Sequence, residues 1–399
     1  MRCEQELLSN MSFVPFGDLL LEPLRNGLTK PKAVRGDGVK MIGMGEIFAN
    51  SRIGAISMSR VPVTEKELSN NCIKNGDILF ARQSLALEGA GKCSIVIDVT
   101  EKTVFESHLI RARIDSSKAN PYFVYYYFNS YVGKEHIKTI VEQVAAAGIR
   151  GSDLVRLKVP CPDLETQDRI AAILSALDEK IATNREINDN LQQQAAALFS
   201  SLYDRSNTEV RFTDLIQILG GGTPKTGENT YWNGNIAFFT PKDVGTPYTL
   251  ITEKTISKEG LSHCNSRLYP VNTVFVTARG TVGKVGMSGV PMAMNQSCYA
   301  LVGKETHQLL VYFYTLKAVD RLKHKASGAV FDAITTRDFE SEQIMKLSDD
   351  DATAFLRVAE PMFQEVLNNN IENLRLSTLR DSLLPKLMSG EIDVSDIQL

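Results

Sequence analysis

The most constraining feature of this sequence is that its first half recurs in its second half. Residues 16–19 (Phe-Gly-Asp-Leu) return as residues 212–215 (Phe-Thr-Asp-Leu), 196 positions later. Residues 78–82, which end in Arg82, return as residues 274–279, which end in Arg279. Self-similarity at a fixed spacing is the signature of a chain built from repeated structural units. We therefore expect two copies of one architecture.

The spacing between the copies shortens along the chain. Arg82 and Arg279 are 197 positions apart, whereas Asp153 and Asp338 are 185 apart. The first copy must therefore contain about a dozen extra residues, which we place within residues 83–150.

Each copy ends in a long hydrophobic seam at alternating four- and three-residue spacing, the pattern of a coiled coil. The seam residues of the first copy are Ile170, Leu174, Leu177, Ile181, Asn184, Asn188, Leu191, Ala195, Leu198 and Leu202. Those of the second are Phe355, Ala359, Met362, Val366, Asn369, Asn373, Leu376, Arg380, Leu383 and Leu387. We expect two helices of about 33 residues, roughly 50 Å long, that pair antiparallel as a spacer between two globular units. The alternative is that each helix only packs on its own domain.

Two asparagines occupy the same central layers of both seams. An antiparallel pairing would place Asn184 opposite Asn373, and Asn188 opposite Asn369. Because a buried amide costs free energy unless it is paired, these layers would fix the register and orientation of the helices. Arg380 does not fit an apolar seam, although its long stem would allow the charge to reach solvent.

The segments before the seams are of mixed α and β character. Short β-branched runs at residues 78–80 and 273–276 follow turn residues and indicate strands. Residues 122–129 and 308–317 are predicted to be helical. The fold class is therefore α+β, with two loop-rich domains and an internal pseudo-two-fold repeat. The expected limits are a first domain at 1–160, a helix at 161–205, a second domain at 206–345, and a helix and tail at 346–399.

Composition fits a soluble, cytoplasmic protein of several domains. The six cysteines are scattered without zinc or redox spacing, no apolar run is long enough to span a bilayer, and no signal peptide is evident. The net charge of −3 does not indicate a nucleic-acid partner, but two mildly basic segments alternate with two acidic ones. That alternation again favours a repeat.

No catalytic motif is complete. Asn120-Pro121-Tyr122 lacks the second proline of an adenine methyltransferase motif, and it is better explained as a helix N-cap followed by proline at the first helical position. The glycine-rich residues 220–225 lack the Gly-Lys-Ser/Thr of a phosphate-binding loop. The five histidines are separated and predict no metal site. We predict that the chain is not an enzyme and holds no cofactor of its own.

Several segments, in this order within a duplicated chain, resemble the specificity subunit of Type I restriction–modification systems. In the second copy they are Gly221-Gly222-Thr223-Pro224-Lys225, residues 231–234, Thr240-Pro241-Lys242-Asp243 and residues 295–301. Residues 162–177 and 384–392, near the ends of the two seams, are also similar to that family. The resemblance covers essentially the whole chain.

The resemblance implies that each globular domain is a target-recognition domain that reads one half of a bipartite site in double-stranded DNA. It also implies that the helices set the gap and dock two methylation subunits, to which motor-nuclease subunits attach. S-adenosylmethionine, ATP and Mg²⁺ would be bound by those partner subunits. The two domains align only at scaffold positions, so the target would be asymmetric.

Base reading needs side-chain donors and acceptors, whereas phosphate contacts need cations or backbone N–H groups on loops. Candidates in the first domain are Lys30, Lys32, Arg35, Lys40, Arg82, Lys92 and Arg150. Candidates in the second domain are Lys225, Lys242, Arg279, Lys284, Asn295, Gln296 and Arg337. Each cation is as readily interpreted as a solvated surface charge, and Asn295 and Gln296 as amides that stabilise a turn.

The first domain departs from the family pattern. It has Asn26-Gly27-Leu28-Thr29-Lys30-Pro31-Lys32 in place of the Gly-Gly-Thr-Pro segment, and Glu106-Ser107-His108 near the Asn-Gln-Ser position. Three alternatives stay open. One is a structural adaptor built on a coiled coil with no DNA role, which the modest net charge favours. The others are an enzyme with an unrecognised site and a silent specificity cassette without active partners.

Overall fold

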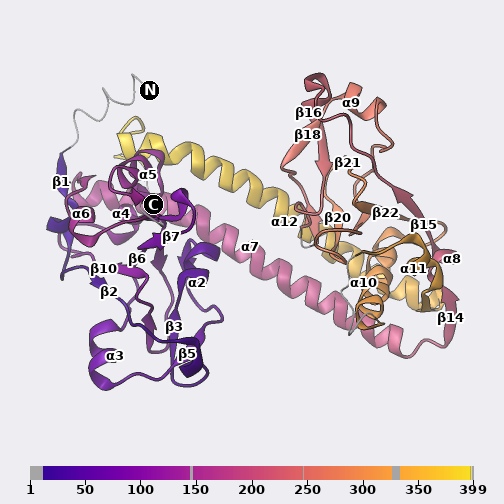
Figure 1. Cartoon of the computed structure of the whole chain (residues 1–399), viewed down its shortest axis with the longest axis horizontal. Helices are drawn as coiled ribbons and strands as arrows, with labels where there is room; N and C mark the ends of the chain where they lie inside the picture. The colour runs from indigo at the N-terminus through magenta and orange to yellow at the C-terminus, as the bar shows by residue number, and fades with distance from the viewer. Residues whose placement is uncertain (1–11, 144–146, 246, 326–332, 396, 398–399) are drawn as a thin grey trace. The chain divides into compact units, whose positions relative to one another are not determined.

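The computed structural model describes residues 12–143, 147–245, 247–325, 333–395 and 397. The chain divides into two compact units (Figure 1). Unit 1 contains residues 1–180 and 376–399, and unit 2 contains residues 181–375. Both boundaries fall inside the two longest helices, so each unit contains one part of each helix.

Unit 1 is built on a five-stranded sheet in the order β2-β10-β6-β8-β4, with a second sheet in the order β5-β3-β9. The strands of the larger sheet are β2 Arg25–Asn26, β10 Leu109–Ala112, β6 Ile78–Ala81, β8 Cys93–Val96 and β4 Arg52–Ile53. Those of the smaller sheet are β5 Ser59–Val61, β3 Val39–Ile42 and β9 Thr103–Phe105. β1 Phe13–Pro15 pairs with β13 Lys158–Pro160, and β7 Gln83–Ser84, β11 Glu142–Gln143 and β12 Ala147–Gly148 form a further small sheet.

Unit 2 repeats the larger sheet, the smaller sheet and the two-stranded pair, whereas the sheet of β7, β11 and β12 has no counterpart among its described residues. Its larger sheet, β15-β22-β19-β20-β17, contains β15 Ile216–Gly220, β22 Cys298–Gly303, β19 Val274–Thr277, β20 Val285–Ser288 and β17 Tyr248–Thr249. Its smaller sheet contains β18 Lys254–Ile256, β16 Trp232–Phe239 and β21 Met292–Met294, and β14 Thr208–Arg211 pairs with β23 Gln343–Lys346. In both smaller sheets one outer strand is antiparallel and the other parallel to the middle strand. The predicted α+β fold with an internal repeat is confirmed.

The shorter helices connect and cover these sheets. In unit 1 they are α2 Met44–Ala49, α3 Glu65–Asn71, α4 Pro121–Asn129, α5 Tyr131–Lys138 and α6 Gly151–Leu154, with 3-10 turns η2 Phe16–Leu19, η3 Lys32–Val34 and η4 Leu87–Gly89. In unit 2 they are α8 Phe212–Leu215, α9 Lys258–Ser262, α10 Gln308–Lys325, α11 Thr336–Ser341 and the turn η5 Asn229–Tyr231.

Matching backbone hydrogen bonds show how closely the repeat is kept. Phe16 N donates to Leu157 O, and Phe212 N donates to Glu342 O, at 2.8 and 2.9 Å. Gly91 and Gly283, which end equivalent turns before β8 and β20, both adopt positive φ (79° and 74°), a conformation that favours glycine. The two turns differ in length, because ten positions separate Arg82 from Lys92 but only five separate Arg279 from Lys284. In the first domain β7 and η4 occupy the longer turn.

Capping explains where the helix after the large sheet begins and ends. Asn120 caps α4, since its Oδ1 accepts hydrogen bonds from the backbone N–H groups of Tyr122 and Phe123. Pro121 occupies the first helical position, so the predicted cap is confirmed. Ser130 has extended backbone and caps α5, which breaks the helical segment there. The second domain has one unbroken helix, α10, that extends eight residues beyond the predicted end at residue 317.

The two long helices are α7 Leu164–Asp204 and α12 Asp349–Ser389. Each has 41 residues, so the predicted length of about 33 was too short. Acidic residues occupy the first turn of both, as the helix dipole favours. The described helices include none that is both long and apolar enough to cross a membrane.

The central part of the helix pair is polar and antiparallel. Asn184 Nδ2 donates to Asn373 Oδ1 at 3.0 Å, and Asn369 Nδ2 donates to Asn188 Oδ1 at 2.9 Å. Glu372 and Asn370 add further acceptors for the amides of Asn184 and Asn188. The layers therefore lie opposite one another as an antiparallel coiled coil requires.

The ends of the helices are built into the domain cores. In unit 1, Ile170 and Leu174 of α7 and Leu387 of α12 join the buried cluster under α4. In unit 2, Phe199 of α7 and Phe355 of α12 join the cluster under α10. The helices therefore both pair with one another and pack on the globular domains, which combines the two alternatives left open by the sequence.

Arg380 is held inward by a carboxylate. Its Nη1 lies 2.6 Å from Asp178 Oδ1 of α7, and its side chain is 28% exposed. A second ion pair joins it to Asp381, the next residue of α12. The guanidinium thus reaches the exposed Asp381 on one side, as its long stem allows, and meets Asp178, which lies beside the predicted seam, on the other.

Candidate nucleic-acid interface

A short turn lies at the centre of the loops that carry the candidate residues of the second domain. Residues 295–297 (the second central turn) connect β21 to β22. Asn295 N donates to Phe239 O at 3.0 Å, and Ser297 O accepts from Ala278 N and Arg279 N at 2.8 and 3.3 Å. The turn therefore brings together the ends of β16, β19 and β21, strands that are far apart in sequence.

The glycine-rich segment packs against the same turn. Gly222 N donates to Met294 O at 3.1 Å. A Cβ atom on Gly221 would lie 2.2 Å from Asn295 O, so only glycine allows this approach. Trp232 Nε1 donates to Lys225 O at 3.1 Å and closes the far end of the segment. Three motifs that are separate in the sequence thus form one structure.

The side chains of the second central turn have divided roles. Asn295 Oδ1 accepts from Ser297 N at 3.0 Å, so this amide stabilises the turn. Gln296 is exposed, and its Oε1 accepts a hydrogen bond from the Thr223 hydroxyl. That bond orients the Gln296 amide and leaves its N–H groups free to donate to a ligand.

The first domain builds an equivalent turn from different residues. In residues 106–108 (the first central turn), Glu106 N donates to Ile42 O and Arg82 N donates to His108 O, at 2.9 and 2.8 Å. Leu28 N donates to Phe105 O at 2.8 Å, as Gly222 N does to Met294 O in the second domain.

The glycine requirement is also kept in the first domain. A Cβ atom on Gly27 would lie 2.1 Å from Phe105 O. The residues that seemed to depart from the family motif therefore keep the backbone of that motif. The first domain differs from the family motif in the side chains that this backbone carries.

Those side chains differ in charge and in donors. Glu106 accepts a hydrogen bond from Met44 N and lies 3.6 Å from Arg35 Nη2. His108 Nδ1 is 3.1 Å from Gln83 Oε1, beside Arg82. The first central turn thus contains a carboxylate, a hydroxyl and an imidazole at the positions where the second contains two amides and a hydroxyl.

Several candidate cations form ion pairs within their own domain, and their role in DNA contact stays a prediction. The pairs are Lys30–Glu67 at 2.9 Å, Arg35–Glu106 at 3.6 Å, Lys40–Glu101 at 2.7 Å, Arg150–Glu142 at 2.6 Å and Lys242–Glu253 at 3.4 Å. The side chains of Lys30 and Lys40 are mostly buried. The pKa values of their partners, Glu67 and Glu101, lie below the usual range because hydrogen bonds stabilise the charged carboxylates. For Glu67 the largest cause is the Thr64 backbone N–H, followed by Lys30, whereas for Glu101 it is Lys40, followed by Arg60.

Other candidate cations have side chains without a hydrogen bond or ion pair to the described part of the chain. They are Lys32 and Arg82 in the first domain, and Lys225, Arg279, Lys284 and Arg337 in the second. Lys92 has no ion pair, but its Nζ donates a hydrogen bond to Phe48 O at 2.8 Å. All of these except Arg82 and Lys92 are exposed. They are the cations whose charge is most available to a phosphate.

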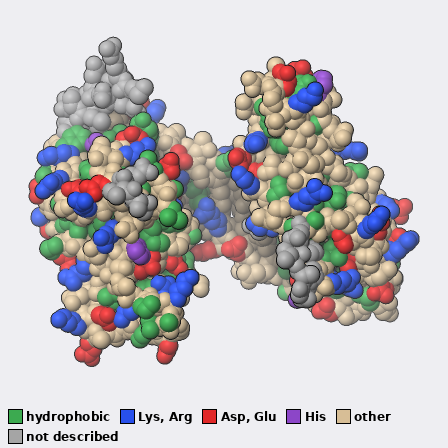
Figure 2. Space-filling model, in the orientation of Figure 1, with side chains coloured by type: hydrophobic (Ala, Val, Ile, Leu, Met, Phe, Trp, Pro, Cys, Tyr) green, Lys and Arg blue, Asp and Glu red, His purple; other side chains and the backbone are tan. Residues whose placement is uncertain are grey.

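Basic and acidic side chains are interspersed over the visible face of each unit (Figure 2). This mixture agrees with the net charge of −3. On this face, positive charge is therefore not gathered into one basic patch.

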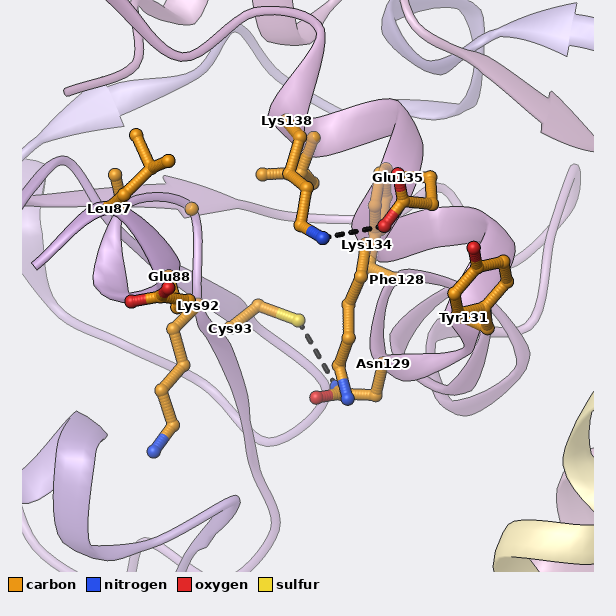
Figure 3. Close-up of a pocket in the computed structure, with 13 residues that line it drawn as sticks. Leu87, Glu88, Lys92, Cys93, Phe128, Asn129, Tyr131, Lys134, Glu135 and Lys138 are labelled. Atoms are coloured by element: carbon orange, nitrogen blue, oxygen red, sulfur yellow. Dashed lines mark hydrogen bonds and ion pairs between the residues drawn. The ribbon is translucent and has the colours of Figure 1, made fainter. Parts of the chain in front are cut away.

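A pocket beside Lys92 contains cations that the sequence analysis missed. It has a volume of about 420 Å³ and lies between the turn after β7 and helices α4 and α5. Lys134 and Lys138 line it, and Lys138 is paired with Glu135 at 2.6 Å (Figure 3). The four-residue spacing of these lysines on one helical face was the signal that could have identified them.

Cys93 at the base of this pocket is not a reactive thiol. It is buried, and Asn129 donates to its sulfur at 3.2 Å (Figure 3). Burial raises the pKa of Cys93 to about 12, and burial likewise raises that of Cys298 to about 12. Among the described residues, no group of three or more His, Cys, Asp or Glu side chains is placed to bind a metal ion.

The chain is similar in sequence to two specificity subunits and in fold to a solved one. The chain is 24% identical to the Type I restriction enzyme HindI specificity subunit of Haemophilus influenzae, over 81% of this chain and 88% of the relative. It is 21% identical to the putative Type I restriction enzyme MjaX specificity subunit of Methanocaldococcus jannaschii, over 94% and 92%. The crystal structure of a Type I restriction–modification S subunit from M. genitalium matches its fold, with a TM-score of 0.61 at 16% identity, covering 95% of this chain and 96% of that one.

The family model for the Type I restriction modification DNA specificity domain matches the chain twice. The matched residues are 14–193 and 205–346, which correspond to the two copies of the repeat. The chain therefore belongs to the family of Type I restriction–modification DNA specificity proteins.

Proposed function

We propose that this chain is the specificity subunit of a Type I restriction–modification complex, and that each domain reads one half of a bipartite, asymmetric site in double-stranded DNA. The observation that carries the proposal is the pair of central turns. They share a backbone frame, yet one presents Glu106, Ser107 and His108 and the other Asn295, Gln296 and Ser297. A common frame with different donors and acceptors suits two domains that read different base sequences.

Gln296 is the side chain best placed to read a base. An amide can bond to adenine through both its donor and its acceptor in the major groove. Thr223 fixes the orientation of this amide, which lowers the entropy lost on binding. Lys225, Arg279 and Lys284, on neighbouring loops, would contact phosphates and hold the turn in register.

In this proposal the chain performs no chemistry. Two methylation subunits would dock on the helices, bind S-adenosylmethionine and transfer the methyl group, with the target adenine flipped into their pockets. Motor-nuclease subunits, attached through the methylation subunits, would use ATP and Mg²⁺. The complex would act in the cytoplasm, where it meets DNA.

The proposal is tested by mapping methylated adenines in cells that express this chain with its neighbouring methylation subunit. We expect a gapped, asymmetric motif that disappears when this chain is deleted. The absence of any motif, with the methylation subunit shown to be active beside another specificity chain, would favour a silent cassette.

A structural adaptor is the remaining alternative, and DNA binding separates it from a specificity subunit. We expect the assembled complex to bind its mapped site with an affinity that falls steeply with salt, because neutralised phosphates release counterions. Salt-independent or absent binding to the mapped site would favour the adaptor.

A further inference from the structure

The most unusual layer of the helix pair is a buried polar cluster in unit 1, formed by Tyr126, Asp178 and Arg380 (the polar cluster). Arg380 Nη1 is 2.6 Å from Asp178 Oδ1, and the Tyr126 hydroxyl donates to Asp178 Oδ2 at 2.7 Å. The Asp178 side chain is only 8% exposed. Each oxygen of this carboxylate therefore has a partner, one from α12 and one from α4.

The repeat places an apolar cluster at the equivalent positions of unit 2. Phe313 follows Val311-Tyr312 as Tyr126 follows Val124-Tyr125. An offset of 185 converts Asp178 to Phe363 and converts Ala195 to Arg380. Phe313, Phe363 and Ala195 (the apolar cluster) are all buried in one core, with the two rings 5.5 Å apart. The duplication thus kept the position of this layer while its chemistry diverged.

This divergence affects which helices can pair. If two copies of α7 paired with one another in the same antiparallel register, each Asp178 would face Ala195 of the other copy. If two copies of α12 paired, each Arg380 would face Phe363. In a pair of α7 helices the buried Asp178 would keep only the Tyr126 hydroxyl, and in a pair of α12 helices Arg380 would keep only Asp381. Pairing of α7 with α12 joins the two opposite charges and is therefore favoured.

The asparagine layers do not make this distinction. In a pair of α7 helices Asn184 would face Asn188, and in a pair of α12 helices Asn369 would face Asn373. Amide–amide hydrogen bonds can form in either case. The asparagines therefore set register, and a different layer must select the partner.

We propose that the polar cluster is a partner-selecting surface: around Asp178, helix α7 accepts a helix that presents a guanidinium, and rejects a second copy of itself. The surface makes the two unlike halves of one chain pair in preference to two like halves. A charge that is satisfied only in the correct partner is a general means of specificity. The proposal does not depend on DNA binding.

The test starts from the folded full-length chain. A protease site inserted between Ser206 and Asn207 is cleaved after folding, which leaves two fragments that each carry one long helix. Isotopically light and heavy samples are mixed in urea below the unfolding transition until light and heavy fragments have exchanged partners. Native mass spectrometry then counts unlike and like pairs.

For the wild-type chain we expect unlike pairs to exceed like pairs at least about tenfold, since each like pair leaves two side chains of the polar cluster without the ion pair between Asp178 and Arg380. The variant Tyr126→Phe/Asp178→Phe/Arg380→Ala gives unit 1 the residues of the apolar cluster. Its fragments should pair at random, with like pairs about half of the total.

Two further variants keep the test decisive if the triple variant does not fold. Asp178→Asn, which has nearly the same shape, should raise the share of like pairs, because it removes the ion pair that only the unlike pairing can form. Asn184→Ala/Asn188→Ala/Asn369→Ala/Asn373→Ala removes both asparagine layers from like and unlike pairs alike and should leave partner selection unchanged. Random pairing of the wild-type fragments, or undiminished selection in Asp178→Asn and the triple variant, would overturn the proposal.

Discussion

In the first domain Lys30, Arg35 and Lys40 each face a carboxylate, whereas in the second domain Lys225 and Lys284 are exposed and have no such partner among the described residues. The backbone frame beneath both sets is the same. The difference shows that duplication preserved the sheets, the glycine contacts and the central turns, while the charges on them diverged. Recognition can therefore change in one domain without rebuilding its fold.

The largest expected effect concerns the apolar cluster of unit 2. Phe363→Ala should lower the free energy of unfolding by about 4 kcal/mol, because a fully buried ring is lost and a cavity remains. Its counterpart change in unit 1, Asp178→Leu/Arg380→Met, should cost far less, since both charges are removed together. Urea unfolding of both variants, monitored by circular dichroism, measures the two losses of unfolding free energy. Equal losses would mean that the two clusters contribute alike to stability.

The next effect concerns the shared glycine contact. Gly221→Ala should destabilise unit 2 by about 3 kcal/mol, because its Cβ would meet Asn295 O at 2.2 Å. Trp232, the one tryptophan of the chain, reports unfolding of unit 2 by fluorescence.

The neighbouring glycine and its counterpart in the first domain provide matched controls. Gly220→Ala should be nearly neutral, since no atom lies within 4 Å of its Cβ position. Gly27→Ala should destabilise unit 1 and leave the Trp232 transition in place. A Gly220→Ala effect as large as that of Gly221→Ala would contradict the close-contact argument.

A smaller effect is expected from the unpaired cations. Lys225→Ala/Lys284→Ala should weaken DNA binding by the assembled complex at least about tenfold and reduce the slope of log affinity against log salt by about 2. Lys30→Met/Lys40→Met removes cations already paired within the protein and should leave the slope unchanged. Titrations of labelled DNA at several salt concentrations measure both. A larger loss of affinity and slope in Lys30→Met/Lys40→Met than in Lys225→Ala/Lys284→Ala would mean that the ion-paired lysines leave their carboxylates and bind phosphates.

The smallest expected effect is a loss of stability of unit 1 at acid pH. The pKa values of Glu67 and Glu101 are lowered, so their contribution to stability is complete above the ordinary carboxyl pKa and is lost as the pH falls through the lowered values. Unit 1 should therefore weaken below about pH 4. Glu67→Gln/Glu101→Gln should flatten this dependence in urea titrations, and an unchanged dependence would assign it to other carboxylates.

The long helices could be predicted from sequence because their seam is local and periodic, so its spacing alone places Asn184 opposite Asn373. The partner of Arg380 could not be predicted, since Asp178 lies beside the seam rather than on it. The part of α10 beyond residue 317 was missed although Ala318, Val319 and Leu322 continue the apolar helical spacing and are buried.

The candidate interface was predictable only as a set of loops. Whether a lysine is free or paired depends on contacts such as Lys30 with Glu67, which are 37 positions apart and follow no periodic pattern. Gly27 and Gly221 occupy the same backbone position, yet their neighbours differ so much that the sequence suggested a departure. Only the hydrogen bonds around the central turns establish the correspondence.

The most direct test of the account is to map adenine methylation in cells that express the Gln296→Ala chain with its methylation subunit, beside the wild type. We predict that the variant motif loses or relaxes positions in one half only, while the other half and the gap are unchanged. A Ser107→Ala chain, changed at the equivalent position of the first central turn, should alter only the other half. Changes in both halves from either substitution, or in neither half from both, would contradict the claim that each central turn reads its own half-site.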